Sequence, residues 1–152
     1  MLTVTRELQF DAGHRIHGHE SKCAFYHGHR YVAEVTVCAP EQDGLGRIVD
    51  FSVIKANVGA WIDAKWDHNM ILHPDDPMLQ TNLFPDKRPY VMPRWAANPT
   101  AENMAKLLFK QAEHLLGSNL VGLRISHVRL YETPNCWADW DWTKPIGEMP
   151  RQ

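Results

Sequence analysis

The chain has 152 residues, with 16 lysines and arginines against 18 aspartates and glutamates, for a formal charge of −2. This length suits a single domain over residues 1–152 with a substantial hydrophobic core. The balance of interspersed charges argues against nucleic acid or an anionic membrane as a partner. No stretch approaches the roughly 20 apolar residues of a membrane span, and the three cysteines fit neither a zinc finger nor a disulfide framework. We therefore expect a cytoplasmic protein with no nucleic-acid or membrane partner.

The N-terminal third of the chain predicts two strands on either side of a histidine-rich loop. Residues 2–12 form a strand-like run, and residues 29–39 alternate apolar and polar side chains, which is typical of a half-buried strand. Turn residues at 43–46 lead into a third, short predicted strand at 47–50.

Two amphipathic helices are predicted from apolar residues at helical spacing. The first has a stripe made of Ile54, Val58, Trp61 and Ile62, and it should end before Asp67. The second should begin after Thr100, which suits an N-cap, and stop at Gly117. Between them, residues 74–99 contain six of the ten prolines, which predicts mainly loop with a short strand at 90–92.

A last strand is predicted at about 123–133, where Val128, Leu130 and Glu132 share one face. The order of strands, helix, helix and strand indicates an α+β fold, with both helices on one side of an antiparallel sheet. The tryptophans that follow are expected to pack on the core or on a neighbouring subunit. They are Trp137, Trp140 and Trp142.

Side chains that bind metals gather between the first two strands. His27 and His29 project from one face if their segment is a strand, and His14 lies beside them in an antiparallel pairing. Three neutral imidazoles with an open position are typical of a catalytic zinc site. His17 and His19 have the same spacing, so spacing alone leaves the ligands open. A strand follows directly only after His29, and this favours the second pair.

Six short motifs occur along most of the chain in a specific order. They are FDAGH at 10–14, CAFYHGH at 23–29, IVDF at 48–51, WDH at 66–68, NPTAE at 98–102 and YET at 131–133. With this set the chain resembles the 6-pyruvoyl-tetrahydropterin synthase family. The resemblance implies a tunnelling fold, in which a four-stranded antiparallel sheet and two helices per subunit form a barrel by oligomerisation. It further implies a homohexamer built as a dimer of trimers.

The resemblance also implies roles for particular residues. Zinc would be bound by His14, His27 and His29, the catalytic residues would be Cys23, Asp67 and His68, and the substrate would be bound by Glu132, Thr100 and Glu102. Cys23 would be the general base, since nearby positive charge favours a thiolate. His68, supported by Asp67, would transfer a second proton, and Glu132 would accept hydrogen bonds from the pterin.

The short spacing between Cys23 and His27 is similar to that of the 6-carboxy-tetrahydropterin synthase branch of queuosine biosynthesis. The implied reaction converts 7,8-dihydroneopterin triphosphate to 6-carboxy-5,6,7,8-tetrahydropterin, acetaldehyde and triphosphate. The nearest alternative is 6-pyruvoyl-tetrahydropterin synthase, which eliminates triphosphate without cleaving a carbon–carbon bond. An alternative of another class is a non-catalytic pterin- or metal-binding protein.

Several of these residues also have purely structural interpretations. Asp67 and His68 would serve as a polar pair that ends a helix, Glu132 as a strand residue facing the surface, and Thr100 with Glu102 as a helix cap. The triphosphate requires cations, and the candidates are Lys22, Arg15 and Arg30. The segment 73–98 is longer than in compact members of the carboxy-forming branch, so we expect it to shape either the pocket entrance or the subunit surface.

Overall fold

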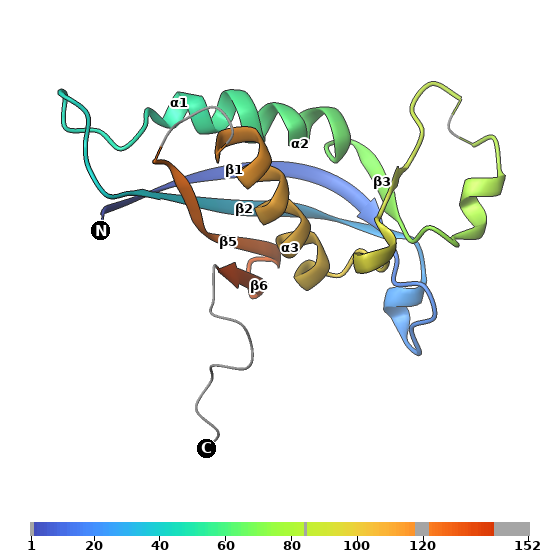
Figure 1. Cartoon of the computed structure of the whole chain (residues 1–152). Coiled ribbons are helices and arrows are strands. Elements are labelled where there is room, and N and C mark those ends of the chain that lie inside the picture. Colours follow the sequence, from blue (N-terminus) through green and yellow to red (C-terminus); the bar gives the residue numbers. More distant parts are fainter. Residues whose placement is uncertain (1, 84, 118–121, 142–152) are drawn as a thin grey trace, which may run out of the picture.

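The computed structural model describes residues 2–83, 85–117 and 122–141, which form one twisted six-stranded sheet with helices packed against it (Figure 1). The strands are β1 (Leu2–His14), β2 (His27–Ala39), β3 (Asn69–Leu72), β4 (Tyr90–Val91), β5 (Arg124–Thr133) and β6 (Cys136–Asp141). Their order across the sheet is β4-β3-β1-β2-β5-β6. The pairs β1–β2, β2–β5 and β5–β6 are antiparallel, whereas β3 is parallel to both β1 and β4.

Both predicted helices are present. The first is a continuous helical segment made of α1 (Phe51–Ile54), a π-helical turn (Lys55–Gly59) and α2 (Ala60–Lys65). The second is α3 (Ala101–Ala112), which continues into another π-helical turn (Glu113–Gly117). Thr100 is its N-cap, because the Thr100 side chain accepts a hydrogen bond from the Asn103 amide at 3.2 Å. None of the helices in the described segments has the length and apolar content that a membrane crossing requires.

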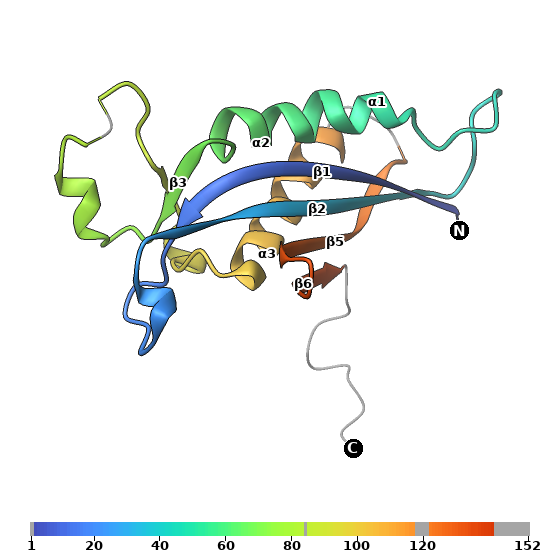
Figure 2. The same cartoon turned by 180° about the vertical axis from the view of Figure 1, so that it is seen from behind.

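The core lies between one face of the sheet and these two helices (Figures 1 and 2). Alternate residues of the strands point into it, since side chains change face with a period of two. On β2 these are Tyr31, Ala33, Val35 and Val37, all fully buried. The helices contribute their apolar stripes, for example Ile54, Val58 and Ile62 from the first and Met104, Leu108 and Ala112 from the second.

The expectation of a four-stranded antiparallel sheet is wrong, because the sheet has six strands and includes parallel pairs. The third predicted strand, at 47–50, is also wrong. The segment is a loop, and nearby carboxylates accept from backbone amides around its start and just after its end. Asp43 Oδ1 accepts hydrogen bonds from the Leu45 and Arg47 amides, each at 2.9 Å. Asp50 accepts from the Ser52 amide at 2.8 Å and so caps α1.

Three short strands extend the sheet, and two of them, β3 and β6, were not indicated by the sequence pattern. β3 continues the sheet beside the end of β1, and the predicted short strand near residue 90 is confirmed as β4. β6 forms a hairpin with β5, so Trp137 and Trp140 belong to a strand rather than to an irregular tail. Trp142 lies outside the described residues. The rest of the proline-rich segment is mainly loop, as predicted, with two short 3₁₀ turns, η3 (Pro77–Gln80) and η4 (Arg94–Ala96).

Candidate active site

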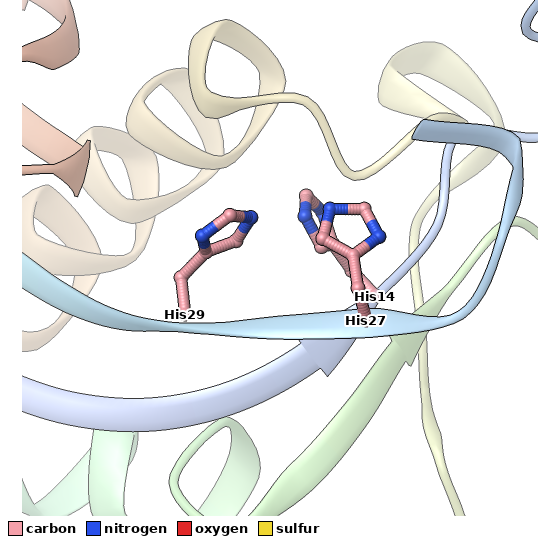
Figure 3. A group of neighbouring side chains, drawn as sticks. All are labelled: His14, His27 and His29. Atoms are coloured by element: carbon pink, nitrogen blue, oxygen red, sulfur yellow. The ribbon is translucent and has the colours of Figure 1, made fainter. Parts of the chain in front are cut away.

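Three histidines meet where β1 ends and β2 begins (Figure 3). His14 is directly opposite His27 in the antiparallel register, and His29 lies two residues further along the same face of β2. One ring nitrogen from each histidine lies within 4.8 Å of the others. The predicted ligand set is therefore brought together. Within the described residues, His17 and His19 belong to no comparable group.

Hydrogen bonds orient two of these rings for metal binding. His14 Nδ1 donates to the Pro99 carbonyl at 2.8 Å, and His27 Nδ1 donates to the Phe25 carbonyl at 2.7 Å. A carbonyl oxygen only accepts, so each Nδ1 carries a proton, and in the neutral ring Nε2 then has the lone pair that can bind a metal. Backbone carbonyls commonly hold metal-binding histidines in this way.

The Nε2 atoms of the site have the properties expected of metal ligands. His14 Nε2 and His29 Nε2 are buried and have no well-aligned hydrogen bond among the described residues. Burial lowers the pKa of His29, and so do its histidine neighbours, although Glu132 opposes this. The neutral imidazole is the form that binds a metal. Three neutral histidine nitrogens at this separation fit a divalent ion such as zinc.

Glu132 completes the inner wall of the site. It is on β5, on the face shared with buried Val128 and Leu130, as the sequence pattern predicted. Its Oε1 lies 3.2 Å from His14 Nε2 and 3.6 Å from His29 Nε2. The His14 imidazole lowers the pKa of the Glu132 carboxyl, and this outweighs the opposite effect of burial. Glu132 is therefore ionised and accepts hydrogen bonds.

Cys23 lies on the short 3₁₀ turn η1 (Lys22–Ala24), four residues before His27. Its side chain is partly exposed. The main chain around it is held by the first residues of the same loop, since the Ile16 amide donates to the Cys23 carbonyl at 2.8 Å. Cys23 is thus on a structured turn next to the metal-binding strand.

Asp67 and His68 lie between α2 and β3 and form a hydrogen-bonded pair. Asp67 Oδ2 accepts from His68 Nδ1 at 2.7 Å, and Asp67 Oδ1 accepts from the Asp11 amide at 2.9 Å. This contact between adjacent side chains occurs while His68 has a φ of 51°, in the left-handed region that few non-glycine residues adopt. Burial raises the pKa of Asp67, but the hydrogen bonds from Asp11 and His68 outweigh it and keep Asp67 ionised.

Comparison with known proteins settles the family. The sequence model described as 6-pyruvoyl tetrahydropterin synthase matches residues 3–142. The chain belongs to this family. It is 43% identical over 143 residues to a protein of Rickettsia felis named 6-carboxy-5,6,7,8-tetrahydropterin synthase, with 91% of this chain and 99% of the relative covered. A protein of the same name from Haemophilus influenzae is 28% identical over 147 residues, covering 92% and 99%.

Several solved structures share the fold of this chain. An uncharacterised protein from Wolinella succinogenes superposes with a TM-score of 0.74 at 23% identity, covering 93% of this chain and 98% of the other. The 6-pyruvoyl tetrahydropterin synthase of Caenorhabditis elegans gives a TM-score of 0.67, also at 23% identity, covering 93% and 96%. The likeness confirms the α+β fold of the family, and membership makes this chain an enzyme of the pterin synthase type.

In this synthase chain no hydrogen bond among the described residues joins Cys23 to the Asp67–His68 pair. His68 borders an open hollow of about 690 Å³, which is also lined by Asp11, Gly13, Arg30 and Lys87, and by His27 and His29. Side chains alternate along β1, so Asp11 and Gly13 face away from the helices, whereas Ala12 and His14 are buried against them. His14 therefore faces the helices, whereas Asp11 and Gly13, which share the hollow with His68, belong to the other face of the sheet.

The predicted substrate-binding residues Thr100 and Glu102 occupy the start of α3. Thr100 is the N-cap, and Glu102 is exposed in the first turn, where its charge suits the helix dipole. Of the three cations considered for the triphosphate, Arg15 is held by Asp76 at 2.6 Å and Arg30 by Asp11 at 2.6 Å. Lys22 is exposed on η1.

Two residues at the site were missed by reasoning from the sequence. Tyr31 is fully buried on the same face as His27 and His29, and its ring centroid lies 5.6 Å from that of His29. Burial raises the pKa of Tyr31, and its hydroxyl has no hydrogen-bond partner among the described residues. The period of two along β2 would have found it. Asp76 lies in the proline-rich segment, where no strand or helix periodicity indicates its role.

Proposed function

We propose that this chain is a zinc-dependent 6-carboxy-5,6,7,8-tetrahydropterin synthase of queuosine biosynthesis, acting in the cytoplasm. It would convert 7,8-dihydroneopterin triphosphate to 6-carboxy-5,6,7,8-tetrahydropterin, acetaldehyde and triphosphate. The observation that carries the proposal is the group of three histidines, with ring nitrogens within 4.8 Å of one another, beside Glu132. The names of relatives such as that from Rickettsia felis support the carboxy-forming branch.

His14, His27 and His29 would hold the metal through nitrogens that have no protein partner. When bound, zinc supplies Lewis acidity, which polarises the side-chain oxygens of the substrate. The carbonyls of Pro99 and Phe25 fix the orientation of two of the rings before the metal arrives.

Glu132 would bind the pterin. Its carboxylate has two oxygens, and the pterin offers a ring N–H and an exocyclic amine side by side, so two parallel hydrogen bonds can form. The histidines that keep Glu132 ionised also keep it an acceptor. Thr100 and Glu102, at the start of α3, would make secondary substrate contacts.

Cys23 would act as the general base and His68 as the second proton-transfer group. Asp67 holds the proton on His68 Nδ1, which leaves His68 Nε2 to accept or donate a proton. Because His14 faces the helices while His68 is exposed beside a hollow bordered by the other face of the sheet, we infer that His68 serves the site of a neighbouring subunit. The homohexamer, a dimer of trimers, would therefore be required for activity.

Product analysis tests this function. Zinc-loaded protein is incubated with 7,8-dihydroneopterin triphosphate, the products are identified by mass, and acetaldehyde is measured separately. The carboxy product together with acetaldehyde is the expected result. The pyruvoyl product would assign the chain to the other branch of the family, and the absence of turnover would favour a pterin- or metal-binding role.

A Cys23→Ala variant separates catalysis from binding. We expect it to retain zinc and to lose turnover, because the three histidines remain while the base is removed. Cys136→Ala is the matched control, since Cys136 is an exposed thiol on β6. Equal activity of the Cys23→Ala variant and this control would contradict the role given to Cys23.

A further inference from the structure

The loop that carries Cys23, residues 15–26, is closed by a carboxylate from a distant part of the sequence. Asp76 is the N-cap of η3, and its side chain is 0% exposed. Asp76 Oδ2 accepts from Arg15 Nε at 2.6 Å, and Oδ1 accepts from the Tyr26 hydroxyl at 2.7 Å and from the Met78 amide at 2.9 Å. Such complete pairing is what a buried carboxylate requires.

The two side chains that Asp76 holds are the first and last residues of that loop. Arg15 directly follows the ligand His14, and Tyr26 directly precedes the ligand His27. The Arg15 guanidinium carbon also lies 4.5 Å from the centre of the Tyr26 ring, within cation–π distance. Asp76, Arg15 and Tyr26 thus form one contact that fixes both ends of the loop relative to each other.

Contacts continue from Arg15 to the turn that contains Cys23. Arg15 Nη1 donates to the Ala24 carbonyl at 3.4 Å, and the Ile16 amide donates to the Cys23 carbonyl at 2.8 Å. The backbone carbonyls of Cys23 and Ala24 are therefore hydrogen-bonded to residues 16 and 15, respectively. The position of Arg15 is in turn set by Asp76.

The contact is strong because it is ionic and buried. Burial raises the pKa of Asp76, but hydrogen bonds from Arg15, Met78 and Tyr26 together outweigh it, so Asp76 remains ionised. The same segment holds the loop at a second point. The His17 amide donates to Asn98 Oδ1 at 2.8 Å, and Asn98 Nδ2 donates back to the His17 carbonyl at 3.1 Å.

We propose that Asp76 is a positioning residue of the synthase, which holds Arg15 and Tyr26 and thereby places Cys23 relative to the three histidines. This inference rests on the proposed function, in which Cys23 moves a proton. The histidines themselves depend less on Asp76. His14 and His27 pair across β1 and β2, and Pro99 holds the His14 ring from another segment. Loss of Asp76 should therefore disturb the loop before it disturbs the metal site.

The test compares Asp76→Asn and Tyr26→Phe with the control Asp75→Asn. Asp75 is the adjacent residue, but its side chain is half-exposed and pairs with Arg94. Three properties are measured: hydrogen–deuterium exchange of peptides covering 15–26, the absorption spectrum of bound Co²⁺, and the kcat and KM of the zinc-loaded hexamer. The first two do not depend on turnover.

We expect Asp76→Asn to speed exchange in the loop, to leave the Co²⁺ spectrum unchanged, and to lower kcat by about 10- to 100-fold with KM nearly constant, because a small displacement of a reacting group has a large effect on rate. Tyr26→Phe removes one hydrogen bond and should act in the same direction with a smaller effect. Asp75→Asn should behave as the wild type.

Unchanged exchange in the loop, or an unchanged kcat, would overturn the proposal. Loss of the Co²⁺ spectrum would also overturn it, because Asp76 would then support the metal site itself. If Asp76→Asn does not fold, the same readouts of Tyr26→Phe decide. If the wild type shows no turnover, the proposed function fails, and the exchange and Co²⁺ results alone then decide whether Asp76 holds the loop.

Discussion

At the scale of single residues, the site is defined by buried polar atoms that the protein leaves without good partners. His14 Nε2 and His29 Nε2 are buried beside the Glu132 carboxylate, yet neither has a well-aligned hydrogen bond among the described residues. Leaving such an atom unpaired costs about 1–3 kcal/mol. A bound metal removes this cost, so binding of the ion and stability of the fold are linked.

Glu132→Gln should weaken pterin binding. The amide presents one donor to the donor edge of the pterin, so one hydrogen bond becomes a clash of donors and the charge is lost. We expect Kd for a pterin to rise about 10- to 100-fold, with zinc content unchanged. Fluorescence titration of a pterin and metal analysis measure the two quantities. Glu113→Gln, an exposed carboxylate at the end of the α3 helical segment, is the control and should bind normally.

Asp76 should make the stability of the protein depend on pH in the acid range. The native pKa of Asp76 lies below its ordinary value, so its contribution is complete above the unfolded pKa and is lost as the pH falls through the native pKa. Asp76→Asn should lower the free energy of unfolding by about 3 kcal/mol near pH 7, as expected for a broken buried ion pair.

The difference in free energy of unfolding between wild type and Asp76→Asn should shrink as the pH falls from about 5 to about 2, because the wild-type carboxyl then becomes neutral, like the amide. Urea unfolding at several pH values measures it. A difference that stays constant over this range would show that the carboxylate charge of Asp76 does not contribute.

At the scale of elements, the segment between β3 and η4 contacts two other parts of the chain at the end of the sheet. Asp76 reaches the loop 15–26, whereas Lys87 lines the hollow beside His68 and donates to the Asp67 carbonyl at 2.7 Å. The segment therefore contacts the loop that carries Cys23 and also the Asp67–His68 pair. This supports the interpretation that it shapes the pocket rather than only the subunit surface.

Lys87 lines the hollow beside His68, and we predict that it contacts the triphosphate there. Lys87→Ala should then raise KM by about fivefold, because one such cation is worth about 1 kcal/mol, while zinc content stays unchanged. Steady-state kinetics and metal analysis test this. The control is Lys65→Ala on α2, an exposed lysine in the last turn of its helix. An unchanged KM in Lys87→Ala would place the triphosphate elsewhere.

At the scale of the whole molecule, we propose that Cys23 of one subunit and His68 of a neighbouring subunit complete each site. Mixing two inactive variants tests this directly. When Cys23→Ala and His68→Ala are unfolded together and reassembled, about a quarter of the sites should be active. Such a site receives wild-type Cys23 from one subunit and wild-type His68 from its neighbour. Each variant reassembled alone is the control. No recovery in the mixture would mean that both groups act within one subunit.

Local patterns were enough to predict the two helices, β1, β2 and β5, because apolar periodicity records which side of each element faces the core. They were also enough to predict that His14, His27 and His29 meet, since two strands joined by a loop bring their facing ends together. The loop at 47–50 and the strand β6 were not predicted, and neither was β3. Side-chain hydrogen bonds removed strand donors in the first, and the partner strand decided pairing in the second.

Only the tertiary structure showed the role of contacts between distant segments. Asp76 is 61 residues from Arg15 and 50 from Tyr26, and no local periodicity relates a carboxylate in a proline-rich loop to either of them. The same holds for the position of His68 relative to the metal site, which depends on how β3 pairs with β1. Periodicity in a sequence indicates whether a residue is buried or exposed. Which distant residue it contacts depends on how the whole chain packs.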